Sequence, residues 1–138
     1  MTEAVLLDTT VASFLYPAKQ DRLQRHLYQA HLDGKILALC FQSVAELLAW
    51  AEERRWGAAR RAALDSFLSK FLIIPYDLEL ARVWARVMTH SKRIGRRLEA
   101  GDAWIAATAV RRQIPLVTHD RDFVDLDLPG FGVICYAT

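Results

Sequence analysis

Length, composition and charge bound the class of protein. The chain has 138 residues and a mass of 15.7 kDa, which is typical of one domain, so we expect a single domain over residues 1–138. Apolar residues make up 53% of the chain and charged residues 25%, a balance that excludes a disordered chain. The net charge of +2 is too small to indicate a nucleic-acid-binding protein by its sum alone.

Short apolar runs in the sequence predict buried β-strands. In chain order these runs are residues 4–7, 36–40, 72–74, 116–117 and 132–135. Longer stretches between them have helical periodicity, most clearly where Leu80, Val83, Trp84, Val87 and Met88 recur on one helix face. Because parallel strands need crossover connections, this alternation predicts an α/β fold, with a central parallel sheet of about five strands flanked by helices.

The compartment is predicted from two observations. The longest apolar run, residues 36–41, is far shorter than the roughly 18 residues of a membrane span, and the first residues lack the pattern of a secretory signal. Cys40 and Cys135 lie in apolar runs, which favours buried, reduced thiols over a disulfide or a metal pair. We therefore expect a cytoplasmic protein with no membrane association.

Charged residues are unevenly distributed along the chain. Of the 18 basic residues 14 are Arg, whose planar guanidinium suits phosphate. Residues 82–97 contain six basic residues and no acidic one, whereas residues 120–127 contain four Asp and one Arg. Each cluster alone is typical of a solvated helix face or an acidic loop. Together they favour a polyanion held on Arg beside carboxylates that hold a metal.

Four acidic residues are predicted to lie at one edge of the sheet. Asp8 and Asp120 follow the first and fourth expected strands, Glu46 is expected in the first turn of the helix after the second strand, and Asp102 opens an Ala-rich helix. The carboxyl edge of an open α/β sheet is where ligands bind. Converging carboxylates repel one another by about 3–4 kcal/mol per pair at short range, so such a cluster persists where a cation neutralises it.

Each acid also has a structural interpretation. Residues 43–46 form a capping-box pattern with Ser43 at the cap, Asp8 and Asp102 suit helix N-caps, and Asp120 suits a turn. Capping does not require all four acids to collect at one edge, which favours the metal site. The ligands are all oxygens and no Cys/His set has zinc spacing, so Mg²⁺ is expected, with Mn²⁺ as a substitute.

The acid-bearing segments resemble the PIN domain family, and within it the VapC-type toxin ribonucleases. The matching segments are residues 8–11, 43–48, 101–109 and 116–123. Asp8, Glu46 and Asp102 match the first three acidic positions of the family. For the fourth we favour Asp120 and keep Asp122 as the alternative, while the hydroxyls of Thr10 and Thr118 are expected to orient a carboxylate or to act as caps.

The resemblance implies a PIN-like three-layer fold and a Mg²⁺-dependent endoribonuclease that leaves a 5′-phosphate and a 3′-hydroxyl. Asp8, Asp102 and Asp120 are expected as metal ligands, and Glu46 as a water-mediated ligand or proton acceptor. The resemblance also implies a cognate antitoxin and a homodimer. It leaves open which RNA is cut, whether an antitoxin is encoded nearby, and whether one or two metals bind.

Other protein classes also place acids at the end of a parallel sheet. A phosphotransfer receiver domain needs a Lys after its last strand, but no Lys follows Cys135 in this sequence. A dehalogenase-type phosphatase needs a second Asp two residues after the first, and this position is Thr10. The main alternative is a PIN fold that binds RNA or protein without cutting, which a Mg²⁺-dependent cleavage assay would distinguish. The four His residues form no obvious acid–base pair, which disfavours a metal-free route through a cyclic phosphate.

Two surfaces are predicted for macromolecular partners. The basic segment predicts an RNA-binding surface at Arg93, Arg96 and Arg97 whose affinity weakens with salt. Apolar residues near the first and third helices predict an antitoxin-binding surface, with simple core packing as the alternative. These apolar residues are Phe14, Leu15, Tyr16, Trp50 and Trp56.

Overall fold

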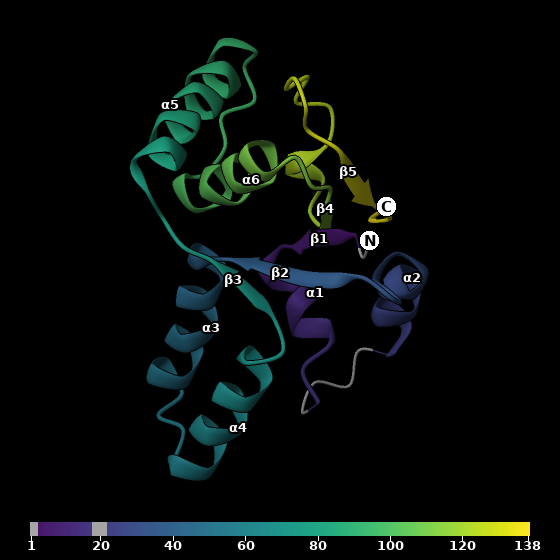
Figure 1. Cartoon of the computed structure of the whole chain (residues 1–138), viewed down its shortest axis with the longest axis vertical. Helices are drawn as coiled ribbons and strands as arrows, with labels where there is room; N and C mark the ends of the chain where they lie inside the picture. The colour runs from purple at the N-terminus through teal and green to yellow at the C-terminus, as the bar shows by residue number, and fades with distance from the viewer. Residues whose placement is uncertain (1–2, 18–21) are drawn as a thin grey trace.

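A parallel sheet of five strands forms the centre of the protein (Figure 1). The computed structural model describes residues 3–17 and 22–138. The strands are β1 (Ala4–Leu7), β2 (Ile36–Cys40), β3 (Leu72–Ile74), β4 (Leu116–Thr118) and β5 (Val133–Cys135). They lie in the order β3-β2-β1-β4-β5, and each neighbouring pair is parallel. The predicted α/β fold with a central parallel sheet of about five strands is confirmed.

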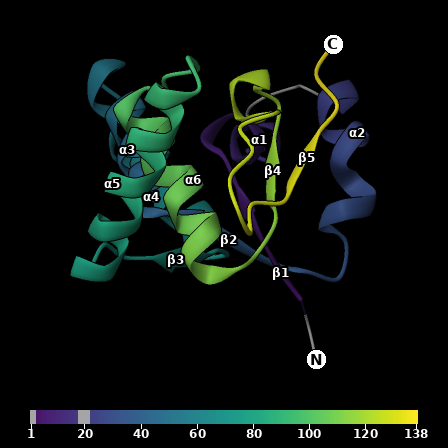
Figure 2. The same ribbon diagram turned by 90° about the horizontal axis from the view of Figure 1, so that it is seen from above.

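Helices cover both faces of the sheet (Figure 1). One face carries α1 (Thr9–Phe14), α2 (Arg22–Leu32), α3 (Phe41–Glu53) and α4 (Ala58–Leu68). The other carries α5 (Leu78–Arg93) and α6 (Ala100–Arg112), which run beside each other in Figure 2. A short 3₁₀ helix, η1 (Arg121–Phe123), follows β4. None of the helices in residues 3–17 and 22–138 has the length and apolar character needed to cross a membrane.

Alternate side chains of the strands feed two separate cores. Leu6 of β1 packs with the helices α5 and α6, whereas Val5 and Leu7 pack with α1 to α4. The same alternation occurs in β2, where Ala38 and Leu39 belong to opposite cores. This is the two-residue period of a strand buried on both faces, which explains why the central strands are read as continuous apolar runs.

The edge strand β3 differs from the sequence prediction. A buried strand was expected over residues 72–74, but only Ile74 is buried, and Leu72 and Ile73 are exposed. The reason is the strand order, which places β3 at the edge of the sheet, where one side has no neighbouring strand. The other strand boundaries agree with the prediction to within one residue, with β4 one residue longer and β5 one residue shorter.

Both cysteines are free thiols. Cys40 is buried at the end of β2 and accepts a hydrogen bond from Thr108 Oγ1 at 3.2 Å. Burial raises the pKa of the Cys40 thiol above its ordinary value, which makes this cysteine a weak nucleophile. Cys135 is only half-buried, so the predicted burial is confirmed for Cys40 and wrong for Cys135.

Candidate metal centre

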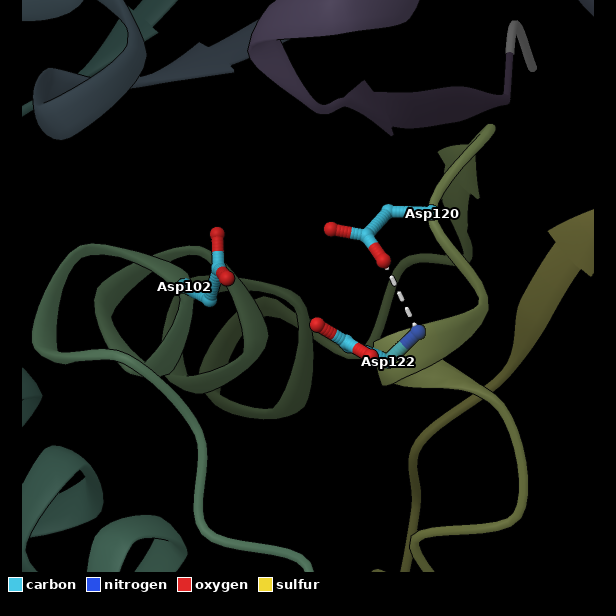
Figure 3. A group of neighbouring side chains, drawn as sticks. All are labelled: Asp102, Asp120 and Asp122. Atoms are coloured by element: carbon cyan, nitrogen blue, oxygen red, sulfur yellow. Dashed lines mark hydrogen bonds between the residues drawn. The ribbon is translucent and has the colours of Figure 1, made fainter.

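Three carboxylates converge beside the sheet, on Asp102, Asp120 and Asp122 (Figure 3). One oxygen of each lies within 4.8 Å of the others. Asp102 comes from the first turn of α6, Asp120 directly precedes η1, and Asp122 lies within η1. Asp120 Oδ1 accepts a hydrogen bond from the backbone N–H of Asp122 at 2.9 Å, so it is the N-cap of η1 and holds this turn in place.

Asp8 lies at the end of β1 and is nearly buried, with 4% of its surface exposed. Its Oδ1 accepts from the backbone N–H of Val11 at 2.8 Å, so Asp8 is the N-cap of α1, and its Oδ2 accepts from the Thr118 hydroxyl. The backbone N–H of Asp120 donates to Thr118 Oγ1 at 3.0 Å. Thr118 therefore connects Asp8 to the turn that carries Asp120. This contact agrees with the expectation that Thr118 orients a carboxylate.

The two threonines after Asp8 have other contacts. Thr10 is exposed, and its carbonyl accepts a hydrogen bond from the Ser13 hydroxyl at 2.6 Å. Thr9 is buried and donates to Ser43 Oγ at 3.0 Å, across the gap between α1 and α3. Among the described residues the hydroxyl that contacts the Asp8 carboxylate is that of Thr118, so the role predicted for Thr10 is not seen.

Glu46 reaches the start of α6 from α3. It is half-buried, and its Oε1 accepts a hydrogen bond from Gln42 Nε2 at 3.1 Å. A Cβ atom at Gly101 would lie 3.4 Å from Glu46 Oε1, which places this carboxylate next to the residue before Asp102. The five acids thus surround one region but are not equally close: three converge directly, and Asp8 and Glu46 flank them.

Two of the capping interpretations are wrong. The helix α3 starts at Phe41, directly after β2, so Ser43 is buried in its first turn and Glu46 is in its second turn, and they form no capping box. The residue that precedes α6 is Glu99, which makes Asp102 the third residue of the helix rather than its N-cap. The N-cap interpretation is correct for Asp8.

The electrostatics of the cluster indicate a site for a cation. Burial and the charges of Asp120, Glu46, Asp122 and Asp8 raise the pKa of Asp102 from 3.8 to about 6. Burial also raises the pKa of Asp8, although its hydrogen bonds from Thr118 and Val11 act in the opposite direction. Carboxylates held this close destabilise one another unless a cation neutralises them, and an all-oxygen donor set suits a hard divalent cation.

Comparison with known proteins identifies the family of the chain. The family model described as PIN domain matches residues 5–128. The chain belongs to the PIN domain family. It is 35% identical over 124 residues to Ribonuclease VapC5 of Mycobacterium tuberculosis, covering 90% of this chain and 88% of that protein. This membership excludes the receiver-domain and dehalogenase-type alternatives.

Solved structures of similar fold include toxin–antitoxin complexes. One is VapBC-5 from Mycobacterium tuberculosis, with a TM-score of 0.70 and 28% identity over 96% of this chain and 98% of that one. Another is FitAcB from Neisseria gonorrhoeae, with a TM-score of 0.73 and 26% identity over 94% of this chain and 96% of that one. The predicted resemblance to the VapC-type branch of the PIN family is confirmed.

The histidine beside the acids of this PIN domain has a packing role. His119 Nδ1 lies 2.5 Å from the Tyr28 hydroxyl, and the ring packs edge-on against Phe14 and Tyr28, each with centroids 5.6 Å apart. Tyr28 is fully buried, and its hydroxyl also accepts from the backbone N–H of Tyr136 at 3.0 Å. The His119 side chain therefore has a hydrogen-bond partner and two aromatic neighbours, and these contacts hold the backbone that joins Thr118 to Asp120.

The predicted RNA-binding arginines lie between α5 and α6. Arg93 ends α5, and Arg96 and Arg97 follow it, all three exposed. Arg96 donates to the backbone carbonyl of Asp125 at 3.3 Å and to that of Arg121 at 3.5 Å. Arg96 therefore stabilises η1 and the loop after it, so its substitution would also affect the fold. Arg93 and Arg97 are the better probes of phosphate binding.

Gln42 is a residue of the site that the sequence analysis does not identify. It lies four residues before Glu46, and this spacing places the two side chains on the same face of α3, where Gln–acid pairs form hydrogen bonds. That spacing is the signal that predicts the contact. The partner of Gln42 on the other side, Tyr76, lies 34 residues away, and no local pattern predicts it.

Proposed function

We propose that the chain is a metal-dependent endoribonuclease, the toxin of a toxin–antitoxin pair, and that residues 1–138 form a single PIN domain. The observation that supports this most is the convergence of Asp102, Asp120 and Asp122, flanked by Asp8 and Glu46, in a PIN chain similar to a VapC ribonuclease. A PIN fold used only for binding has no need of five acids that destabilise one another.

The acids are assigned roles by their positions. Asp102, Asp120 and Asp122 would hold Mg²⁺, or Mn²⁺ in its place, with Asp8 held beside them by Thr118. When bound, the metal supplies charge neutralisation at the phosphate and a lowered pKa of water. Glu46, which reaches the site from α3, would contact the metal through water and would accept the proton of the attacking water. Both Asp120 and Asp122 lie in the cluster, so we propose both as the fourth acidic position.

A cleavage assay tests the proposal and its alternative. Purified protein is incubated with a pool of structured cellular RNA, in EDTA or in Mg²⁺, and the products are examined for 5′-phosphate ends. We expect cleavage in Mg²⁺ alone. Cleavage that persists in EDTA would contradict the metal mechanism, and RNA binding without cleavage in either condition would favour a non-cleaving PIN module.

RNA binding is expected to depend on Arg93 and Arg97. Each phosphate contact releases counterions, so removing both arginines should reduce the log–log salt slope of RNA affinity by about 1.4 to 1.8. Fluorescence anisotropy in EDTA measures this slope without cleavage. The matched control is the pair Arg60→Ala and Arg112→Ala, because both are exposed and Arg112 ends α6 at the opposite end from Asp102. An equal loss of slope in both pairs would mean that the effect is one of net charge.

An antitoxin is the proposed protein partner, because similar structures are VapBC and FitAcB assemblies. The predicted surface needs one correction: Phe14 is 6% exposed and belongs to the core. Leu15, Tyr16, Trp50 and Trp56 are half-buried around it, and Tyr16 stacks on Trp56 with centroids 6.1 Å apart. Leu15 also lines a groove of about 290 Å³ between α2 and α4.

We expect the antitoxin to protect this groove. Its lining includes the apolar residues Leu32, Phe67 and Phe71. It also includes two cations, Arg25 and Lys70, against one acid, Asp33, so an apolar segment with acidic residues fits it. Co-expression with a candidate antitoxin, such as a small protein encoded next to this chain if there is one, followed by hydrogen exchange, should show protection in α1, α2 and α4. Protection limited to α5 and α6 would contradict this surface.

A homodimer is proposed through the edge of the sheet at β3. Leu72 and Leu78 are 53% and 66% exposed, and Phe41 lies exposed at the start of the neighbouring α3. An unpaired strand edge beside exposed apolar side chains is typical of an interface. Light scattering of purified protein, with Leu72→Lys as the disrupting variant and Leu23→Lys as an exposed control on α2, measures the oligomeric state.

A further inference from the structure

The Gln42 side chain has a fixed orientation between two partners. Its Nε2 donates to Glu46 Oε1 at 3.1 Å, and its Oε1 accepts from the Tyr76 hydroxyl at 3.3 Å. The reversed amide would turn its oxygen toward the Glu46 carboxylate, which can only accept and would repel it, so Glu46 selects this orientation and the Tyr76 hydroxyl, which can donate or accept, completes it. Gln42 therefore presents a donor to Glu46 and stands between that acid and Tyr76.

A row of aromatic rings holds Tyr76 in place. Tyr76 stacks on Trp104 with ring centroids 4.4 Å apart, and Trp104 stacks on Trp84 with centroids 5.2 Å apart. Trp84 Nε1 donates a hydrogen bond at 3.2 Å to the backbone carbonyl of Ala100, which is the first residue of α6. The row is thus tied to the start of α6, the helix that carries Asp102. Gln42 is consequently fixed relative to the acid cluster and not only to its own helix.

Gly101 leaves the space that Gln42 and Glu46 occupy. A Cβ atom at this position would lie 2.9 Å from Gln42 Nε2 and 3.4 Å from Glu46 Oε1. The first distance is too short for a real contact, so any larger residue would displace the end of the Gln42 side chain. The bare backbone of Gly101 lets both side chains pack against the first turn of α6, directly beside Asp102.

We propose that Gln42 is a positioning residue that holds Glu46 against the start of α6, and that Gly101 is required because a side chain there would separate the two. This inference rests on the proposed function, since it concerns the acid that flanks the metal centre. Glu46 carries a charge of the same sign as Asp102, so without the Gln42 amide its half-buried carboxylate turns toward solvent. The site then loses its flanking acid while the fold is kept.

Gly101→Ala separates a positioning role from a structural one. Ala is a better helix former than Gly, and the atom it displaces is the end of a flexible side chain, so we expect an unchanged or higher Tm in EDTA. We expect Mn²⁺ affinity, measured by titration calorimetry, to fall about tenfold, as for loss of other groups that orient metal ligands. The control for Mn²⁺ affinity is Gly57→Ala at the N-cap of α4, where a Cβ would meet nothing within 4 Å.

Gln42→Leu gives a second and independent measurement, because it keeps the side-chain volume and removes the donor. It should weaken Mn²⁺ binding to a similar extent, and adding it to Gly101→Ala or to Glu46→Gln should cause little further loss, because all three act on one contact. Additive losses would overturn the proposal, and so would wild-type Mn²⁺ affinity in both single variants of a protein that cleaves RNA. If the wild-type protein neither binds Mn²⁺ nor cleaves RNA, the proposed function itself fails, and the positioning role fails with it.

Discussion

Replacing Asp102 by Asn is expected to abolish Mg²⁺-dependent RNA cleavage while leaving the metal-free protein folded, with an equal or higher Tm in EDTA. Asp102 is not the N-cap of α6, so the substitution costs only its interaction with the helix dipole, roughly 0.3–1 kcal/mol. Against this, the neutral amide removes a partly buried charge and relieves its repulsion by four neighbouring acids, and burial together with these charges raises the Asp102 pKa to about 6. The two effects oppose each other, and relief of repulsion is the larger.

Magnesium reverses this order of stability. An ion that binds only the folded site raises the Tm of the wild-type protein, and the variant, which lacks one ligand, gains less. Melting curves in EDTA and in Mg²⁺ should therefore cross. The control is Asp65→Asn, an exposed Asp on α4, which should change neither the curves nor cleavage. A variant that melts far lower in both conditions and still cuts RNA would show that Asp102 stabilises the helix and does not hold the metal.

Asp120→Asn and Asp122→Asn, measured by the same melting curves, test which of the two acids binds the metal. Asp120 Oδ1 caps η1, a contact that the Asn side-chain oxygen preserves, so both variants are expected to fold. If both lose metal binding, the two acids share the fourth position of the family. A loss confined to one of them assigns that position to a single residue.

Sequence patterns predict those features that depend on neighbouring residues. The central strands could be placed because Leu6, Leu7 and Leu39 lie in short apolar runs buried on both faces. The N-cap role of Asp8 likewise follows from a contact only three residues long, to the backbone of Val11. In both cases the physical cause lies within a few residues.

Features that depend on distant residues could not be predicted. Leu72 was expected to be buried, but its exposure follows from the position of β3 in the strand order. Ser43 has a capping pattern, yet its hydroxyl bonds Thr9, 34 residues away, because α3 starts without a loop after β2. The choice between Asp120 and Asp122 stayed open for a similar reason, since only the 3₁₀ turn brings both carboxylates toward α6.

Lowering the pH from 7.5 to 5 is expected to stabilise the metal-free protein and to weaken metal binding. The folded-state pKa of Asp102 is raised to about 6 from an ordinary value of 3.8, so the folded state binds a proton more readily than the unfolded state does. Stability therefore rises as the pH falls through 6 toward 4, and it is lower above pH 6. Asp8, whose pKa is also raised, contributes in the same direction.

The size of this effect is set by the contact of Asp102 with solvent. The full shift corresponds to about 3 kcal/mol, of which about 1.4 kcal/mol is gained between pH 7.5 and pH 5. After screening by water at this half-buried site we expect about 0.5–1 kcal/mol, or a rise in Tm of roughly 2–4 °C. Differential scanning calorimetry in EDTA at the two pH values measures it. The Asp102→Asn variant is the control, because it has no carboxyl to titrate and should show a smaller rise.

Metal binding must follow the opposite pH dependence, because the metal and the proton compete for the same carboxylate. With a pKa of about 6, Asp102 is only about one-tenth ionised at pH 5, so Mn²⁺ affinity should fall about tenfold or more, and RNA cleavage with it. Calorimetric titration with Mn²⁺ at pH 5, 6 and 7.5 gives the midpoint directly. An affinity that stays constant down to pH 5 would mean that the titrating carboxylate does not bind the ion. In that case the raised pKa of Asp102 reflects a crowded helix start instead of a metal centre.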